Sequence, residues 1–247
     1  MRAFLLFLLV LARLLWWDLH DKVLICISWR RARDYIDRHV SGRARALCAL
    51  ASFSVGVRFR IDIREETLPA QMIIVANHQS VIDIAAIMAA FRFHSIRFVA
   101  KAELQRWFPA VSRVLRVQRH ALIRRDGEYS RAMHTLDRLA DSLRHGECPV
   151  IFPEGTRSRD GKLLPFQSGA IRRLHARRPL PIVVLALDGG HRFATMKDVL
   201  RLPHRHEYRV TLVGVFPEAS GKRELIEQIQ SAHRKIEESL HSWRCDR

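Results

Sequence analysis

Short apolar runs alternate with helix-like stretches from about residue 56 onward, and this alternation limits the fold more than any other feature of the chain. Short apolar runs bounded by turn-forming residues are typical of strands buried on both faces. Strands separated by helices form an α/β layer architecture with a mostly parallel sheet. The expected strands cover residues 57–63, 72–76, 96–100, 121–124, 149–152, 182–187 and 209–216.

Helical periodicity fills several of the intervening segments, at about residues 81–91, 130–144 and 168–177. The clearest helix lies near the C-terminus, where residues 225–240 repeat apolar side chains at three- and four-residue steps. We therefore predict an α/β fold in which residues 56–247 form one layered domain, a mostly parallel mixed sheet flanked by helices. In such sheets, reactive side chains collect in loops at the carboxyl ends of strands.

Residues 1–55 form a hydrophobic and basic N-terminal region. An apolar run from Ala3 to Trp17 is broken only by Arg13, and as a helix it would extend roughly 22 Å, less than the ~30 Å hydrocarbon core. We expect an uncleaved membrane-associated segment, either spanning or half-inserted, with residues 56–247 on the cytoplasmic side because several arginines follow the segment. The alternatives are a cleaved signal peptide, although no small-residue cleavage pattern follows the run, and a helix of a soluble protein.

The chain is strongly basic, with 42 Lys and Arg against 25 Asp and Glu and a net charge of +17. Such an excess favours anionic partners: nucleic acid, a membrane surface or phosphorylated substrates. The arginines are spread along the chain without interleaved aromatic residues, so we expect no nucleic-acid partner. The four cysteines are far apart and contain no CxxC pair, which argues against a zinc site or a disulfide framework.

His78 and Asp83 lie just after the expected strand at residues 72–76. On one continuous helix they would be about 140° apart, but they can meet if a helix begins between them, and Ser80 is a suitable N-cap. A histidine held by a carboxylate suits a general base that takes a proton from a hydroxyl. The structural alternatives are a histidine without catalytic role and a capping function for Asp83.

A second polar loop follows the expected strand at residues 149–152 and reads Phe-Pro-Glu-Gly-Thr-Arg-Ser. Pro153 and Gly155 favour a turn directly after a buried strand. Arg157 could bind a phosphate with two parallel hydrogen bonds, assisted by backbone N–H groups near Gly155. Glu154 is better suited to orienting its neighbours. The structural alternative for the whole loop is a solvated turn with a surface arginine.

Together, in this order, the two loops resemble the first and third motifs of the glycerolipid acyltransferases, most closely the 1-acylglycerol-3-phosphate (lysophosphatidic acid) acyltransferases. The resemblance extends from about residue 55 to 216. It includes the Lys101-Ala-Glu-Leu stretch, the apolar strand that ends before Arg125, and residues 164–170. It implies a glycerol-3-phosphate acyltransferase-like fold and a membrane-bound enzyme of phospholipid biosynthesis.

The resemblance implies transfer of a fatty acyl group from acyl-CoA or acyl-carrier protein to the free hydroxyl of 1-acylglycerol-3-phosphate. His78, oriented by Asp83, would act as general base without an acyl-enzyme. The acceptor phosphate would contact Arg125, Glu154, Gly155, Thr156 and Arg157, with help from Lys101. No metal or other cofactor is implied, and the partners are the lysophospholipid, the acyl donor and a membrane lipid surface.

Two departures from the family pattern concern the acceptor. Arg124 stands where the family usually has an aspartate, and residues 182–185 read Ile-Val-Val-Leu where the family usually has Val-Pro-Val. Neither change affects His78 or Asp83. Because both changes concern the acceptor, a lyso-ornithine lipid is an alternative acceptor.

Three other functional classes compete with this interpretation. A basic nucleic-acid-binding protein would explain the charge but not the two motifs. A serine or cysteine hydrolase could use His78 and Asp83, yet the chain lacks a Gly-x-Ser-x-Gly nucleophile elbow and Ser80 is too close in sequence to be an obvious nucleophile. A membrane protein that keeps the fold without catalysis would not need the pair intact.

Overall fold

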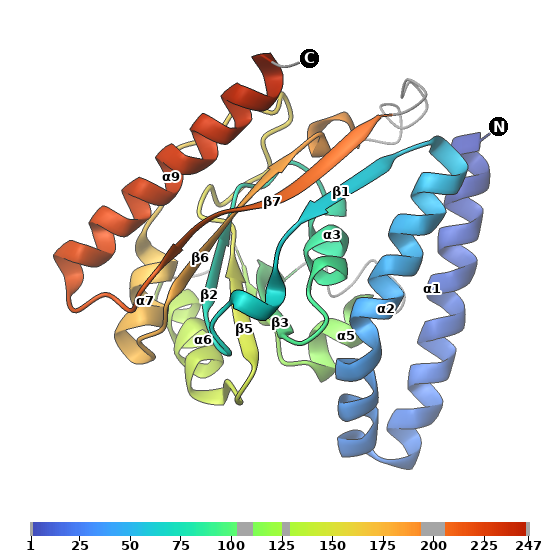
Figure 1. Cartoon of the computed structure of the whole chain (residues 1–247). Coiled ribbons are helices and arrows are strands. Elements are labelled where there is room, and N and C mark those ends of the chain that lie inside the picture. The colour runs from blue at the N-terminus through green and yellow to red at the C-terminus, as the bar shows by residue number, and fades with distance from the viewer. Residues whose placement is uncertain (1, 103–110, 125–128, 194–205, 246–247) are drawn as a thin grey trace.

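A computed structural model describes residues 2–102, 111–124, 129–193 and 206–245 (Figure 1). Within these residues the core is a seven-stranded sheet with strand order β1-β7-β6-β2-β5-β3-β4. All seven predicted strands are present, with ends shifted by a few residues: β1 (Arg58–Asp62), β2 (Ile73–Ala76), β3 (Ser95–Lys101), β4 (Ala121–Ile123), β5 (Glu147–Ile151), β6 (Ile182–Asp188) and β7 (Glu207–Phe216).

The predicted helices are also confirmed, as α3 (Ile82–Ala90), α6 (Tyr129–Ser142), α7 (Gly169–Arg177) and α9 (Lys222–Cys245). The structure adds a short helix that was not predicted, α5 (Val111–Val117), and two 3-10 turns, η1 (Glu65–Thr67) and η2 (Gly190–Phe193). These elements are too short to produce a clear helical period in the sequence.

The sheet is mixed, as predicted, and mostly parallel. Strands β4, β3, β5, β2 and β6 run in one direction, whereas β7 is antiparallel to β6 and β1 is parallel to β7. The carboxyl end of β6 therefore lies beside the start of β7, with Asp188 opposite Arg209. This reversal brings the first residues of β7 to the same edge as the carboxyl ends of the five parallel strands.

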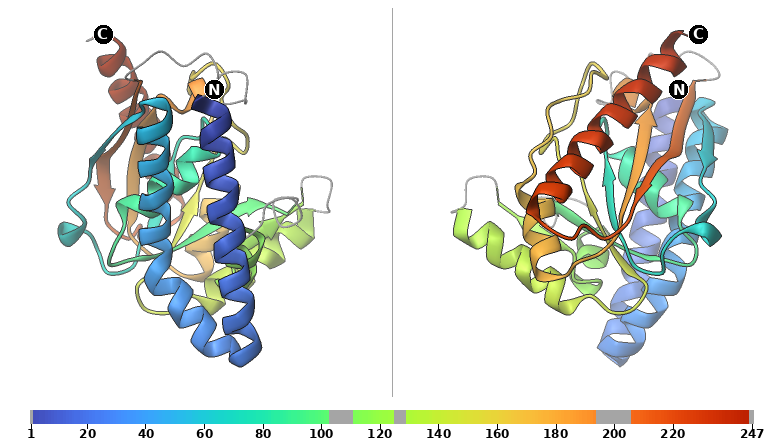
Figure 2. Two further views of the ribbon diagram at one scale, coloured as in Figure 1. Left: turned by 90° about the vertical axis from the view of Figure 1, so that its right-hand side faces the viewer. Right: turned by 60° about the vertical axis from the view of Figure 1, so that its left-hand side comes forward.

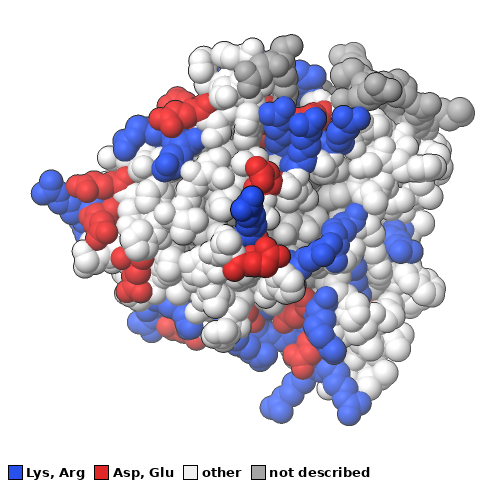
Figure 3. All heavy atoms as spheres, in the orientation of Figure 1, with Lys and Arg blue, Asp and Glu red and all other residues white. Residues whose placement is uncertain are grey.

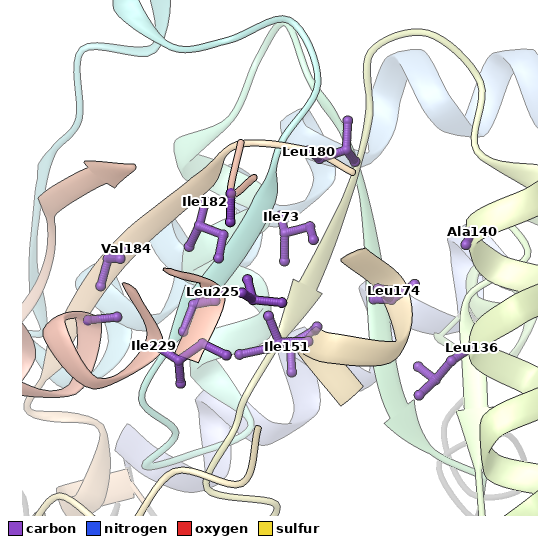
Figure 4. Packing of buried hydrophobic residues seen from close by; sticks show 14 of the residues in the cluster. Ile73, Leu136, Ala140, Ile151, Leu174, Leu180, Ile182, Val184, Leu225 and Ile229 are labelled. Atoms are coloured by element: carbon purple, nitrogen blue, oxygen red, sulfur yellow. The ribbon is translucent and has the colours of Figure 1, made fainter. Parts of the chain in front are cut away.

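Each face of the sheet packs against its own helices because alternate strand residues point to opposite sides. Ile73 and Val75 of β2 contribute to a core with α6, α7 and α9, which Figure 4 shows at close range. Ile74 and Ala76 belong to a second core on the other face, with α3. Both faces of β2 and β6 are buried, as expected for strands in the middle of a layered domain.

Two long helices precede the sheet, α1 (Arg2–Ile27) and α2 (Trp29–Val55), and we call them the hairpin. Helix α2 ends at Gly56, whose φ of 76° is the left-handed conformation that glycine adopts readily. Helix α2 packs against α1 on one side and α3 on the other. Figure 2 shows α1 as the outermost helix of this side of the molecule.

Polar side chains join α1 to the rest of the protein. Asp21 is completely buried and accepts two hydrogen bonds of 2.6 Å from Arg43 of α2. Asp18 pairs with Arg113 of α5 at 2.9 Å. Among the helices of the described ranges, none is both long and apolar enough to cross a membrane.

Candidate active site

The two polar loops predicted to be functional leave neighbouring strands at the same edge of the sheet. Strand β2 pairs with β5 in parallel, with Val75 opposite Ile151, so the loops after these strands begin side by side. The Ser158 N–H donates to the carbonyl oxygen of His78 at 2.8 Å and ties the loops together. On the other side of β2, the Asn77 side chain exchanges two hydrogen bonds of 2.8 Å with the backbone of Leu187.

His78 and Asp83 form a hydrogen-bonded pair, with 2.8 Å between Nδ1 and Oδ2. Helix α3 begins at Ile82, between the two residues, as the argument from sequence required. The Asp83 carboxylate can only accept, so Nδ1 of the neutral imidazole carries the proton and Nε2 keeps its lone pair. The His78 side chain is 16 % exposed, whereas Asp83 is fully buried.

Asp83 also satisfies the start of α3. Its Oδ2 accepts from the N–H groups of Gln79 at 2.6 Å and Ser80 at 2.8 Å. Val81 rather than Ser80 occupies the N-cap position, so the predicted capping residue is wrong by one position. The capping and catalytic interpretations of Asp83 are therefore compatible, because one carboxylate accepts from the helix start and from the imidazole.

Phe152 and Glu154 support His78 from the β5 loop. The Phe152 ring stacks on the imidazole with centroids 4.1 Å apart and an angle of 16° between the planes. Glu154 Oε1 accepts from the His78 N–H at 2.6 Å, and Oε2 accepts from the Leu164 N–H at 3.0 Å. Both carboxylate oxygens of Glu154 are thus used to hold backbone segments together.

Glu154 is buried, and the hydrogen bonds to its carboxylate come from backbone N–H groups and not from a cation. Burial is the main cause that raises its pKa to about 7, and the negative charge of Asp83 adds to the effect. The two N–H groups act in the opposite direction but do not outweigh burial. Glu154 therefore gains or loses a proton near neutral pH.

A cavity of about 600 Å³ opens beside His78. Its size lies within the usual range of small-molecule sites. Most of its lining is apolar, and Thr156, Arg157, Arg159 and Gln167 contribute polar side chains. The apolar lining includes Val81, Ile84, Phe98, Val99, Ala100, Ile123, Met133, Leu136, Ile151 and Phe152.

The loop Glu154–Gly155–Thr156–Arg157 divides into two roles. Gly155, with a φ of 67°, turns the chain and also lines the cavity, and its N–H donates to the carbonyl oxygen of Phe152 at 3.0 Å. Thr156 and Arg157 line the cavity, and neither makes a hydrogen bond within the described ranges. Glu154 does not line the cavity, so its position suits orientation of the loops rather than direct contact with a ligand.

The side chains of two predicted site residues lie outside the described part of the chain. The backbone of Lys101 ends β3 opposite Ile123, at the carboxyl edge of the sheet, but its side chain lies outside what the structure describes. Arg125 falls in the segment 125–128, which is also outside the described residues.

A family model described as Acyltransferase matches residues 60–188, just over half of the chain. The chain belongs to the acyltransferase family. The matched segment begins in β1 and ends at the last residue of β6, so it includes both polar loops and the strands that position them.

Individual relatives agree with this membership. A 1-acyl-sn-glycerol-3-phosphate acyltransferase of Cocos nucifera is 31% identical over 184 residues, which cover 73% of this chain and 56% of the relative. A 1-acyl-sn-glycerol-3-phosphate acyltransferase of Limnanthes douglasii is 29% identical over 191 residues and is covered to 64%, so this chain spans about three fifths of the length of these relatives. A lyso-ornithine lipid O-acyltransferase of Rhodobacter capsulatus is 32% identical over 124 residues, covering 49% of this chain and 41% of that protein.

The fold is shared with a solved structure. The crystal structure of the 1-acyl-sn-glycerophosphate (LPA) acyltransferase PlsC from Thermotoga maritima superimposes with a TM-score of 0.73 at 20% identity. The match covers 96% of this chain and 94% of the other chain, so it includes most of the hairpin as well as the sheet.

Ser80 does not fit the nucleophile of a hydrolase. It is 2 % exposed, its N–H is bound to Asp83, and it does not line the cavity. A nucleophile must reach the substrate beside its base, and Ser80 is turned into the protein instead.

Two segments that sequence reasoning did not identify complete the site. Tyr208, at the start of β7, donates its hydroxyl to Asp83 Oδ1 at 2.6 Å. The turn after β6 contributes Gly190, which packs against Asp83 and Gln79. A buried tyrosine next to a strand is an ordinary core residue in sequence, and only the antiparallel pairing of β7 with β6 brings it to Asp83.

Proposed function

We propose that this chain transfers a fatty acyl group from acyl-CoA or acyl-carrier protein to the free hydroxyl of 1-acylglycerol-3-phosphate, giving phosphatidic acid. The observation that carries the proposal is the His78–Asp83 pair beside a mostly apolar cavity that Arg157 also lines. The cavity offers an apolar wall for an acyl chain, a base for the hydroxyl and a guanidinium for the phosphate.

The mechanism follows from the protonation of His78. Nδ1 is held by Asp83, so Nε2 takes the proton from the acceptor hydroxyl as its oxygen attacks the thioester carbonyl. The new ester C–O bond forms, the C–S bond breaks, and the proton passes from the imidazolium to the departing thiolate. Asp83 stabilises the imidazolium between these steps.

Arg157 is the described cation best placed for the acceptor phosphate. Its guanidinium lines the cavity without an ion-pair partner in the described ranges and can donate two parallel hydrogen bonds. The free N–H groups of Thr156 and Arg157 add donors next to it. Arg125 and Lys101 belong to the proposal as further cations, on the strength of their positions in the sequence.

A lyso-ornithine lipid is the second candidate acceptor. It is supported by the similarity to the lyso-ornithine lipid O-acyltransferase and by Arg124, which replaces the usual aspartate of the family pattern. Arg124 immediately precedes the segment that would approach the headgroup, so its charge would affect which acceptor is preferred.

A membrane surface is the proposed location of catalysis, with the domain on the cytoplasmic side. The outward side of α1 exposes an apolar row that includes Phe4, Leu8, Leu15, Trp16, Leu19 and Val23. In Figure 3 the flank where α1 lies is largely free of charged residues, in contrast to the surface over α9. Apolar surface of this extent is typical of a face that is covered by lipid or protein.

The test is an acyl-transfer assay on membranes that contain the protein, with labelled acyl-CoA or acyl-carrier protein and a panel of lysolipid acceptors. We expect transfer to lysophosphatidic acid, and loss of turnover by orders of magnitude in His78→Ala with unchanged membrane association. A chelator should leave the rate unchanged. Near-normal turnover of His78→Ala would refute the mechanism, and preference for an ornithine lysolipid would support the second acceptor.

A further inference from the structure

The two oxygens of the Asp83 carboxylate are bound very differently. Oδ2 accepts from His78 and from the N–H groups of Gln79 and Ser80. Oδ1 accepts from the Tyr208 hydroxyl, its one donor among the described residues, at 2.6 Å. Asp83 is 0 % exposed, so solvent cannot replace that donor without a rearrangement. The orientation of the carboxylate therefore depends on a residue far from it in sequence.

Tyr208 is held rigidly for this contact. It is fully buried in the core between the sheet and α3, and its ring packs on Phe59 with centroids 5.3 Å apart. Burial is the main cause that raises the pKa of Tyr208 well above its usual value, with the charge of Asp83 as a further cause. The hydroxyl consequently keeps its proton at physiological pH and acts as a permanent donor.

Gly190 provides the room in which this hydrogen bond forms. A Cβ atom on Gly190 would lie 2.7 Å from Asp83 Oδ1, 3.0 Å from Gln79 Cβ and 3.2 Å from a ring carbon of Tyr208. The carboxylate oxygen cannot move aside freely because Asp83 is fixed by four hydrogen bonds. Any larger side chain at position 190 would displace Asp83, Tyr208 or both.

We infer that Tyr208 is a positioning residue for the proposed acyl transfer: its hydroxyl holds Asp83 so that Oδ2 faces Nδ1 of His78. The terminal torsion of an aspartate is soft, so a carboxylate bound through one oxygen alone can rotate. A donor on each oxygen fixes its plane. This inference rests on the proposed function and extends the base from a pair to a chain of three side chains.

Other ionisable groups surround the side chains of Tyr208, Asp83 and His78, and the variant Tyr208→Phe retains all of them. Glu154 approaches from the β5 loop, and Cys48 of α2 and Asp188 at the end of β6 lie close enough to influence Tyr208. Asp188 is itself paired with Arg244 of α9 at 3.0 Å. His206 is bound to the carbonyl oxygen of Gly189 at 2.9 Å.

The first test compares Tyr208→Phe with Tyr35→Phe, which removes the same atom from an α2 ring stacked on His39 outside the site. We expect kcat of Tyr208→Phe to fall about 10- to 100-fold, a range known for residues that orient a ligand or base, with KM within about twofold. Tyr35→Phe should match the wild type.

The pH profile separates positioning from a merely structural role. Without the hydroxyl, the Asp83 charge is less neutralised and attracts a protonated His78 more strongly, so the acid limb of kcat/KM should move to higher pH. The midpoint of that limb does not depend on how much protein is folded. An unchanged or lowered midpoint would overturn the inference even if Tyr208→Phe were unstable.

Gly190→Ala provides an independent variant that retains every polar group. We expect it to lower kcat with little change in KM, whereas Gly42→Ala, which has only a flexible arginine end nearby, should not. Wild-type turnover by Gly190→Ala would count against the inference. If the wild-type protein transfers no acyl group at all, the proposed function fails; if the wild type is active and Tyr208→Phe equals it, only the positioning role fails.

Discussion

The hairpin and the α/β domain arrange their charges in opposite ways. In the domain, α9 buries Leu225, Ile229 and Ile236 and turns its charged residues to solvent. In the hairpin, α1 buries Asp18 and Asp21 and exposes leucine, phenylalanine and tryptophan. The two acidic residues that follow the apolar N-terminal run thus point into the protein, where they pair with arginines.

This difference fits the proposed contact of α1 with lipid. An exposed apolar face costs free energy in water, whereas the same face is favourable against lipid. Among the described residues, the buried Asp21 and Asp188 each have a guanidinium partner, whereas the hydrogen bonds to the Glu154 carboxylate come from N–H groups. Four experiments test the comparison, in order of decreasing effect.

The largest expected effect comes from the buried ion pair of the hairpin. Asp21→Asn leaves Arg43 buried without its counter-charge, and loss of one partner of a buried pair typically costs about 3–5 kcal/mol. We expect a large fall in the thermal midpoint of the detergent-solubilised protein. The control is Asp141→Asn, whose pair with Arg177 is exposed, and it should leave the midpoint unchanged. Equal falls in the thermal midpoint of the two variants would contradict the expected difference between the buried and the exposed ion pair.

Membrane binding should depend on the outward face of α1. Replacing Leu15, Trp16 and Leu19 by serine removes about 1 kcal/mol of lipid contact for each side chain, so partitioning to vesicles should weaken at least about 100-fold. Sedimentation with anionic lipid vesicles measures this. The control replaces Gln230, Arg234 and Glu237 on the exposed side of α9 by serine, which leaves the net charge unchanged. Unaltered binding by the α1 variant would rule out α1 as the contact surface.

Glu154 should make stability depend on pH. The folded protein keeps a proton on Glu154 up to about pH 7, whereas the unfolded chain releases it near the ordinary value of 4.5. The folded state therefore binds more protons between these values, and stability is lost as pH rises through about 7. The thermal midpoint of the wild type minus that of Glu154→Gln should decrease as the pH is raised from 5 to 8. A constant difference would show that Glu154 does not titrate in this range.

The smallest effect concerns the phosphate contact. Arg157→Lys keeps the charge but loses the two parallel donors, so KM for a phosphate-bearing acceptor should rise about tenfold with a smaller change in kcat. Arg172→Lys, on the exposed side of α7, should leave KM unchanged. Steady-state kinetics with lysophosphatidic acid measure both. An unchanged KM for Arg157→Lys would exclude Arg157 as the phosphate ligand.

Local sequence patterns were enough to predict the seven strands, helices α3, α6, α7 and α9, and the way in which His78 can contact Asp83. These features are local: apolar periodicity marks each element, and the start of α3 between positions 78 and 83 is enough to bring the two side chains together. The nearby N-cap was predicted at Ser80 and lies at Val81, because the backbone there bonds to Asp83 instead.

The order of the strands in the sheet is visible only in the tertiary structure. The pairing of β2 with β5 places Glu154 on the backbone of His78, and the reversal of β7 places Tyr208 on Asp83, across 125 residues of sequence. The tertiary structure also decided that Asp18 and Asp21 face inward. Strand order and helix orientation depend on contacts between residues distant in the chain, and local sequence patterns carry no record of those contacts.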